Sequence, residues 1–338
     1  MKTEKIPKKN INRKKILRFI LKFLIIIVLF FLLIQFYNIN ESIIGQWKKY
    51  EYNPILGNSN TGTLFDPCIL IDKGLLKMYL SWREKGNIAL SISKDGIHWS
   101  DIKMVLDRGK KDSWDSVINR ADVIYNNGIY HMWYTGQYLG SSKIGYASSK
   151  DGYNFTKLDK PILVSEYIFE KQSVMNPNVI YDKIENKYKM WYAAGETLEP
   201  DVICYATSKN GINWEKYKDN PIFTPNKNAS SLDFFKVGAC DIHKLSNNKY
   251  LMFYIGYSDI NTARIFIAES KDGVNNWRRS QYPIVFPSKN KFDSEACYKP
   301  AAFYNKKIHK WMLYYNGRTN NKEYIGLVMK NNYQIIIK

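Results

Sequence analysis

The feature that most limits the fold of this chain is an internal repeat of about 58 residues. Its most regular part is a turn, Ser-Lys-Asp/Asn-Gly followed by an aromatic residue, at positions 93–99, 149–155, 208–214 and 270–277. Asp-Gly and Asn-Gly pairs favour tight turns that need positive φ. A short apolar strand precedes each copy, so the turn predicts the end of one strand of a repeated unit.

A second repeated segment, rich in aromatic residues, lies upstream of each turn. Its five copies are at 76–82, 130–136, 188–195, 250–256 and 311–317. A short apolar strand comes before each copy. Four strands per unit are typical of a propeller blade, and five units fill the chain after its N-terminal segment. We therefore predict an all-β chain with one five-bladed β-propeller over residues 46–338.

The fifth unit lacks its last strand, and the missing piece is found at the other end of the propeller. Residues 47–56 (Trp-Lys-Lys-Tyr-Glu-Tyr-Asn-Pro-Ile-Leu) are in phase with residues 214–223. We therefore expect the N-terminal strand to complete the last blade and remove its free edge. A β-sandwich or a solenoid is the alternative, but a sandwich has no such unit and solenoid repeats are usually shorter.

The first 45 residues differ in character from the rest. They hold nine Lys and Arg residues against two Glu, within a formal net charge of +19 for the whole chain. We predict a basic cytoplasmic tail (1–15) and a single transmembrane helix (16–37), which places the propeller in the periplasm or outside the cell. A cleaved signal peptide is the competing interpretation, but no small-residue cleavage site follows Ile34, which favours an uncleaved signal anchor.

Composition excludes several classes of function. The basic residues of the propeller are spread out and its expected compartment holds no nucleic acid, so a nucleic-acid partner is not expected. The four cysteines lack the spacing of a zinc site, and we expect no metal and no cofactor. They are interpreted as small buried residues rather than as disulfide partners.

Together these motifs resemble the five-bladed propeller glycosidase superfamily, which includes glycoside hydrolase families 43 and 32 and the mannoside phosphorylases of family 130. The resemblance covers residues 46–330 and implies a substrate site at one end of the central axis, against the first strand of each blade. Aligning those strands places five residues in corresponding positions: Asp66, Arg120, Asn176, Ala239 and Lys299.

The resemblance also implies roles for acidic residues. Asp66, in Phe-Asp-Pro, matches the base or nucleophile of the family glycosidases, and Asp122 resembles a second-blade aspartate of family 43. Asn176 stands where family 43 has an aspartate, and the family's acid is not found at its usual place. Glu295, before the first strand of blade five, is the remaining candidate acid and is expected to face Asp66 across one sugar.

The same alignment suggests residues that bind substrate. They are Arg120, Asn176, Asp241, Lys299, Arg83 and Arg318. A structural interpretation competes with several of them. Asp122 and Asp241 are explained equally well by hydrogen bonds between blades, and the two arginines after second strands by surface positions. The aspartates of the repeated turns, Asp95, Asp151 and Asp272, are expected to be structural.

We therefore expect a membrane-anchored enzyme of the glycoside hydrolase type, with an extracytoplasmic poly- or oligosaccharide as substrate and partner. Asp66 would act with a second carboxylate, whose separation would decide between retention and inversion. The alternatives are a non-catalytic carbohydrate-binding propeller and a phosphorylase-like enzyme. In the latter, Arg120, Lys299 and Arg318 would bind phosphate around a single acid.

Overall fold

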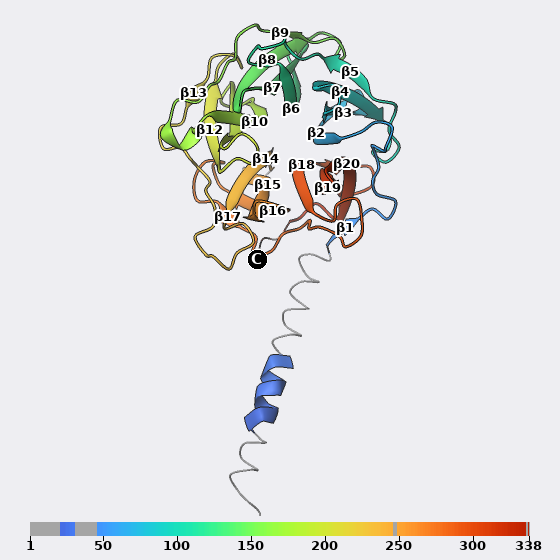
Figure 1. Cartoon of the computed structure of the whole chain (residues 1–338), viewed down its shortest axis with the longest axis vertical. Helices are drawn as coiled ribbons and strands as arrows, with labels where there is room; N and C mark the ends of the chain where they lie inside the picture. Colours follow the sequence, from blue (N-terminus) through green and yellow to red (C-terminus); the bar gives the residue numbers. More distant parts are fainter. Residues whose placement is uncertain (1–20, 31–45, 246–248, 336, 338) are drawn as a thin grey trace, which may run out of the picture.

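The computed structural model describes residues 21–30, 46–245, 249–335 and 337. Its strands form five four-stranded antiparallel units, placed side by side around a central axis (Figure 1). A single parallel bridge between Ser142 and Ser173 joins the second and third units. The predicted all-β propeller with five blades is therefore confirmed.

In each blade the first strand lies nearest the axis and the fourth lies at the rim (Figure 1). Blade one comprises β2 (Leu64–Asp72), β3 (Leu75–Trp82), β4 (Asn87–Ser93) and β5 (Lys103–Leu106). Blade two comprises β6 (Val117–Asn126), β7 (Ile129–Tyr138), β8 (Ser141–Ser149) and β9 (Thr156–Lys157). Blade three comprises β10 (Ser173–Asp182), β11 (Lys187–Gly195), β12 (Val202–Ser208) and β13 (Glu215–Lys216), preceded by the short 3-10 helix η1 (Ile168–Glu170). Blade four comprises β14 (Lys236–Lys244), β15 (Tyr250–Asp259), β16 (Thr262–Ser270) and β17 (Arg278–Arg279). Blade five comprises β18 (Ala296–Asn305), β19 (Lys310–Thr319), β20 (Lys322–Asn331) and β1 (Trp47–Lys49).

The ring is closed by β1, which pairs antiparallel with β20 and supplies the fourth strand of blade five. The segment after β1 continues the pattern, because Leu56 forms a bridge with Ile325 of the third strand. Leu163, Phe223 and Val285 form the same bridge in blades two to four. The predicted closure by the N-terminal strand is confirmed.

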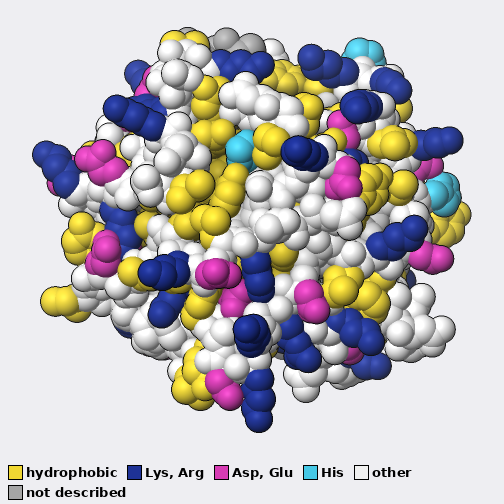
Figure 2. Space-filling model, turned by 90° about the horizontal axis from the view of Figure 1, so that it is seen from above, with side chains coloured by type: hydrophobic (Ala, Val, Ile, Leu, Met, Phe, Trp, Pro, Cys, Tyr) yellow, Lys and Arg dark blue, Asp and Glu magenta, His cyan; other side chains and the backbone are white. Residues whose placement is uncertain are grey.

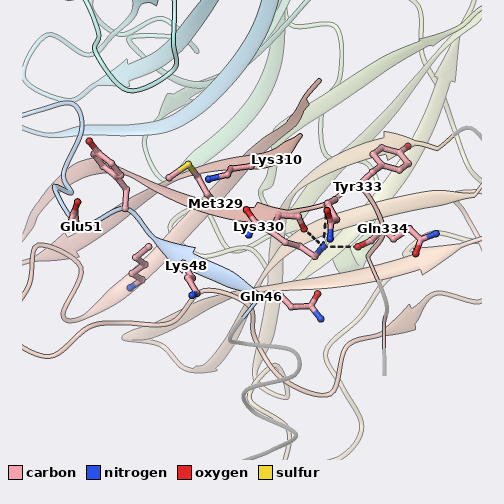
Figure 3. Close-up of a pocket in the computed structure, with 12 residues that line it drawn as sticks. Gln46, Lys48, Glu51, Lys310, Met329, Lys330, Tyr333 and Gln334 are labelled. Carbon is pink, nitrogen blue, oxygen red and sulfur yellow. Dashed lines mark hydrogen bonds between the residues drawn. The ribbon is translucent and has the colours of Figure 1, made fainter. Parts of the chain in front are cut away.

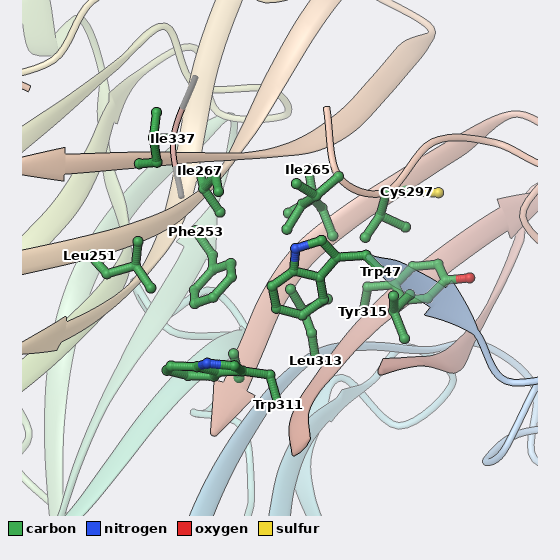
Figure 4. Packing of buried hydrophobic residues seen from close by; sticks show 14 residues of the cluster. Trp47, Leu251, Phe253, Ile265, Ile267, Cys297, Trp311, Leu313, Tyr315 and Ile337 are labelled. Carbon is green, nitrogen blue, oxygen red and sulfur yellow. The ribbon is translucent and has the colours of Figure 1, made fainter. Parts of the chain in front are cut away.

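Trp47 gives this closure a hydrophobic anchor between blades four and five. Its ring is buried and meets the edge of Phe253, with ring centroids 5.6 Å apart. Figure 4 shows it packed among residues of both blades, including Trp311 and Leu313. Because a buried aromatic side chain removes a large apolar area from water, β1 is held by packing as well as by backbone hydrogen bonds.

The repeated turns are built by their own side chains. In the first copy, the Asp95 carboxylate accepts hydrogen bonds from the amides of Ile97 and His98, and Ser93 Oγ accepts one from the Gly96 amide. Gly96 has φ +82°, a conformation that a Cβ atom disfavours. Asp151, Asn210 and Asp272 accept the same bonds in their copies. The structural role predicted for these aspartates is confirmed.

Each turn is also bonded to the aromatic strand of the preceding blade. A side-chain O–H or N–H on the aromatic strand donates to the glycine carbonyl of the turn at 2.7–2.9 Å. The pairs are Tyr79 with Gly152, Trp133 with Gly211, Trp191 with Gly273 and Tyr314 with Gly96. The two repeated motifs of the sequence therefore meet at the boundaries between blades, which explains why they recur together.

The N-terminal predictions fall mostly beyond the described residues. The basic tail (1–15) lies outside them entirely, and of the predicted anchor (16–37) only residues 21–30 are described; these are helical. No helix within the described ranges is long and apolar enough to cross a membrane.

Candidate active site

The site is built on a β-bulge that every blade carries near the start of its first strand. Four bulge residues have left-handed φ: Asp66 (+52°), Arg120 (+55°), Asn176 (+51°) and Lys299 (+30°). These are positions that the sequence alignment made equivalent. Left-handed φ is uncommon for arginine and lysine, and such conformations cluster at ligand sites.

The preceding blade fixes the bulge in three cases. The backbone amide of the bulge residue has no partner in the β-ladder. It donates a hydrogen bond instead to a polar side chain on the second strand of that blade. The pairs are Asp66 with Asn316 (3.1 Å), Arg120 with Ser81 (2.8 Å) and Asn176 with Thr135 (3.0 Å).

A cavity of about 510 Å³ opens at the bulge end of the axis. All five blades line it, so residues far apart in the chain meet around one space. Its polar lining includes Asp66, Arg83, Arg120, Asn176, Glu199, Tyr257, Tyr298, Asn316, Arg318 and Glu323. The volume is in the range of small-ligand sites.

Asp66 is a buried carboxyl group of this cavity. Its Oδ2 lies 3.6 Å from Arg120 Nε and has no hydrogen-bond partner among the described residues. Burial raises the pKa of Asp66, while the charges of Arg120, Lys299 and Arg83 oppose that rise. An ordinary buried carboxyl oxygen would be hydrogen-bonded, so this one is available to a ligand.

Three arginines line the cavity of Asp66: Arg83, Arg120 and Arg318. Arg120 is largely buried, with 15% of its side chain exposed. Arg83 is the most exposed, at 54%, and its Nη2 lies 2.6 Å from Glu323 Oε1. Arg318 donates from Nη2 to the Asn261 carbonyl at 2.8 Å. Planar guanidinium groups bind carboxylate and phosphate oxygens in pairs, which makes this lining suited to an anion.

Two carboxylates of the cavity escaped the sequence analysis. Glu323 accepts hydrogen bonds from Asn316 and Arg83, and burial raises its pKa to about 7. Glu199, on the loop between β11 and β12, accepts a hydrogen bond from the Tyr257 hydroxyl, and burial raises its pKa. Neither occupies a first-strand position, so the alignment that found Asp66 gave no signal for them.

Further polar atoms of the lining lack partners. Asn176 Oδ1 and Tyr298 Oη are buried without a hydrogen bond to any described residue. Together with Asp66 Oδ2 they give the cavity three oxygen atoms without a hydrogen bond among the described residues. Buried polar atoms are normally paired, so this clustering marks the cavity as a polar ligand site.

Asp122, predicted to be catalytic, does not line this cavity, and that prediction is corrected. Its Oδ2 accepts the Val179 amide hydrogen bond at 2.6 Å, and its Oδ1 contacts the Cys68 thiol at 3.3 Å. It therefore links blades one, two and three. Asp241 in blade four serves the same purpose toward blade five, because it accepts the Ala302 amide at 2.6 Å.

Asp241 and Lys299 were predicted to bind substrate, and neither is part of the cavity lining. Lys299 is 1% exposed and donates to the Cys240 carbonyl at 3.1 Å. Its charge opposes the rise in pKa that burial imposes on Asp66 and Asp122. Its role is therefore to compensate buried negative charge beneath the cavity.

Glu295 does not face Asp66, which corrects the second catalytic prediction. It lines a neighbouring cavity of about 590 Å³ that shares Arg318 and Asn321 with the first. Its Oε2 lies 3.2 Å from Arg318 Nε, and its Oε1 accepts the Asn320 amide. Arg318 thus stands between Glu295 and the cavity of Asp66.

The arrangement places a buried carboxyl group, whose pKa burial raises, beside several fixed cations. Within the part of the chain that is described, no cluster of three or more His, Cys, Asp or Glu side chains could hold a metal ion. The side chains that line the cavity offer acid–base and anion-binding chemistry.

A five-bladed propeller with a polar cavity at the mouth of its axis fits the propeller glycosidase superfamily, and solved structures share this fold. A glycoside hydrolase superimposes with a TM-score of 0.69 at 19% identity, over 90% of this chain and 97% of that chain. A beta-1,2-mannobiose phosphorylase from Listeria innocua, in complex with beta-1,2-mannobiose, has a TM-score of 0.66 at 16% identity, over 84% and 96%.

Sequence similarity identifies the family. The profile of glycoside hydrolase family 130, described as beta-1,4-mannooligosaccharide phosphorylase, matches residues 112–334, and the chain belongs to this family. A 1,2-beta-oligomannan phosphorylase from Thermoanaerobacter sp. (strain X514) is 33% identical over 67% of this chain and 74% of its own length. A beta-1,2-mannobiose phosphorylase from the same organism is 31% identical over 47% of this chain and 54% of its own length.

Proposed function

We propose that this protein cleaves β-mannosides by phosphorolysis, with inorganic phosphate rather than water as the attacking group. The observation that carries the proposal is the position of Asp66, a buried carboxyl group in a cavity that three arginines also line. The chain that holds it belongs to the mannooligosaccharide phosphorylase family. The names of the two Thermoanaerobacter relatives support a β-1,2-linked substrate. This was the alternative to the hydrolase expected from the sequence.

The residues of the cavity would divide the work as follows. Arg120, Arg318 and Arg83 hold the charge of the phosphate. A phosphate oxygen attacks the anomeric carbon while the glycosidic C–O bond breaks. Asp66 passes its proton to the leaving oxygen, and Arg120 stabilises the carboxylate that remains. The products are mannose 1-phosphate and the shortened saccharide.

Hydrolysis is the second candidate, favoured by the two further carboxylates in the lining. Glu199 or Glu323 would activate a water molecule opposite Asp66, which is the two-carboxylate chemistry of glycosidases. Both are engaged in hydrogen bonds, to Tyr257 and to Asn316 with Arg83. These bonds restrain them, so we place this candidate second.

The test is an incubation of the full chain with β-1,2-mannobiose and, separately, β-1,4-mannobiose, each with and without inorganic phosphate. We expect mannose 1-phosphate only when phosphate is present, and little free mannose without it. Release of two mannose units regardless of phosphate would establish hydrolysis instead. Saturable binding without any product would establish a non-catalytic carbohydrate-binding propeller.

We also propose that residues 16–37 form a single-pass anchor and that the propeller lies outside the cytoplasm. The support is the apolar run from Phe23 to Ile34, which follows a basic segment. Protease accessibility of the propeller in cells freed of any outer membrane but with an intact inner membrane, compared with lysed cells, tests this arrangement. Protection of the propeller behind the intact inner membrane would contradict it.

A further inference from the structure

The two ends of the propeller have different kinds of loops. First strands begin at the cavity, so the hairpins between first and second strands lie at the opposite end, together with the repeated turns after third strands. We call this end the basal face, with hairpins 73–74, 127–128, 183–186 and 306–309 and turns 93–99, 149–155, 208–214 and 270–277 as its described loops.

The basal face carries a ring of exposed lysines. They are Lys73, Lys94, Lys150, Lys183, Lys209, Lys271, Lys306 and Lys307. The same loops hold four carboxylates: Asp95, Asp151 and Asp272, which accept hydrogen bonds from backbone amides, and Glu185, which pairs with Lys187 and Lys189. At the cavity end, the hairpins between second and third strands carry Arg83 and Lys85 against four carboxylates, Glu84, Glu196, Glu199 and Asp201. Figure 2 shows the propeller from its edge, and basic side chains line its upper rim with few acidic ones among them.

The described chain also enters the propeller at the basal face. Trp47, at the start of β1, pairs with Lys330 at the basal end of β20. A cavity of about 970 Å³ lies there, lined by four lysines and, as its single carboxylate among the described residues, Glu51 (Figure 3). Lys330 Nζ donates to three backbone carbonyls and Lys49 pairs with Asp293, which leaves Lys48 and Lys310 as the cations nearest solvent.

We propose that the basal face rests on an anionic lipid bilayer, with the cavity of Asp66 directed away from the membrane. The inference rests on the proposed anchor, because residues that precede Gln46 would then leave the bilayer beside this face. Lysines on each blade would meet lipid phosphates together, whereas the cavity end offers more carboxylates than cations. Attraction between a polybasic surface and anionic headgroups is additive over several lysines and is screened by salt.

The test compares two exposed positions at opposite ends of the full chain. Ile184, 83% exposed, lies in a basal hairpin, and Leu139, 84% exposed, lies in a cavity-end hairpin. Each is changed to cysteine and labelled with an environment-sensitive fluorophore; the four native cysteines are buried. The labelled chains are inserted into nanodiscs of phosphatidylcholine, with or without phosphatidylglycerol, that contain a nitroxide-labelled lipid.

We expect strong quenching at position 184 in the phosphatidylglycerol discs, and its loss in phosphatidylcholine discs or at high salt. Position 139 should stay unquenched throughout. Equal quenching at both positions, quenching at 139 alone, quenching at neither, or failure of the chain to enter the discs would each overturn the proposal. So would quenching at 184 that is unchanged in phosphatidylcholine discs.

A charge variant tests the lysines themselves. Changing Lys94, Lys150, Lys209 and Lys271 to glutamine should reduce quenching at position 184 to the level at position 139. The matched control removes four exposed lysines from connections that follow fourth strands: Lys110, Lys111, Lys227 and Lys289. The control should leave quenching unchanged; an equal loss in both variants would point to net charge alone and overturn the assignment to the basal face. Preferred binding of the basal face to a soluble acidic polysaccharide, in competition with the discs, would also overturn it.

Discussion

Asp66 combines three properties that are rarely found in one side chain. Its backbone is left-handed, its carboxyl group is buried, and one of its oxygens has no hydrogen-bond partner among the described residues. Each of these costs free energy in the unliganded protein. A ligand that donates a hydrogen bond to Asp66 would recover part of that cost.

Changing Asp66 to Asn should lower kcat/KM on the cleaved mannoside by roughly 100- to 10,000-fold, because asparagine has no proton to give. The thermal midpoint should change little, since the amide is the same shape and the hydrogen bond from the residue 66 amide to Asn316 is kept. Initial rates and a melting curve check both parts. Full activity, or loss of the fold, would contradict the role of Asp66.

Asp122 supplies the matched control for that experiment. Changing Asp122 to Ala removes the acceptor of the Val179 amide, and the unpaired buried group should lower the free energy of unfolding by roughly 1 to 3 kcal/mol. The folded fraction should keep its kcat. A large loss of kcat at unchanged stability would restore Asp122 to a catalytic role.

Glu323 predicts how stability changes with pH. Its pKa rises from 4.5 to about 7 on folding, so the folded chain keeps a proton that the unfolded chain loses. Stability should therefore fall as pH increases from about 4.5 to about 7. Changing Glu323 to Gln removes this loss, and the variant should gain up to roughly 3 kcal/mol on the wild type across that window.

Urea unfolding at several pH values measures the Glu323 effect. Glu295→Gln is the matched control, because it makes the same substitution at a side chain that is 39% exposed in the neighbouring cavity. The outcome that would contradict the prediction is a difference in the free energy of unfolding between Glu323→Gln and wild type that is equal at acid and neutral pH. The Glu323 carboxyl group would then keep the same protonation state across this window.

At the scale of elements, an acidic residue before a first strand ties together other strands of its blade. In blade five, Asp293 is fully buried and accepts hydrogen bonds from Tyr315 of β19 and Lys49 of β1. Asp115 in blade two and Asp233 in blade four bind a tyrosine and a cation in the same way. In blade five this contact also secures the strand that closes the ring.

Changing Lys49 to Ala should therefore destabilise the propeller by roughly 1 to 3 kcal/mol, since it leaves Asp293 buried without its cation. Lys48 is the matched control, because it lies next to Lys49 on β1 with an exposed side chain. Urea unfolding of the two single variants measures the effect. Equal midpoints for both would show that the ion pair adds nothing to the closure.

The strands and turns of each blade were predictable because two different motifs recur from repeat to repeat. The aromatic strands and the Gly turns meet in the structure, for example as Trp133 with Gly211, and their spacing identified the blades. The bulges were not predictable from residue type, because no glycine marks the left-handed positions, which Asp66, Arg120, Asn176 and Lys299 occupy. The acidic contacts were missed too, since Asp293 and Lys49 are separated by most of the chain.

At the scale of the whole molecule, the cavity of Asp66 forms because the five blades close into a ring. Asp66 lies in blade one and Glu323 in blade five, yet both line one cavity because the ring brings the last blade against the first. First-strand positions such as Asp66 and Arg120 could be aligned by the repeat and were found. Glu199 lies on a loop that differs from blade to blade, so no repeat predicts that it reaches the axis.

The same closure makes the N-terminal strand essential to the propeller. A chain that begins at Gln46 keeps β1 and should melt at the same temperature as the full chain. A chain that begins at Asn58 loses the Trp47 contact with Phe253 and the pairing with β20. Its melting temperature should fall, and it should associate, because the exposed edge of β20 offers unpaired amides and carbonyls to another molecule. Size-exclusion chromatography and thermal melts of the two chains measure these effects. If the chain that begins at Asn58 were a monomer of equal stability, the propeller would not need the fourth strand of blade five.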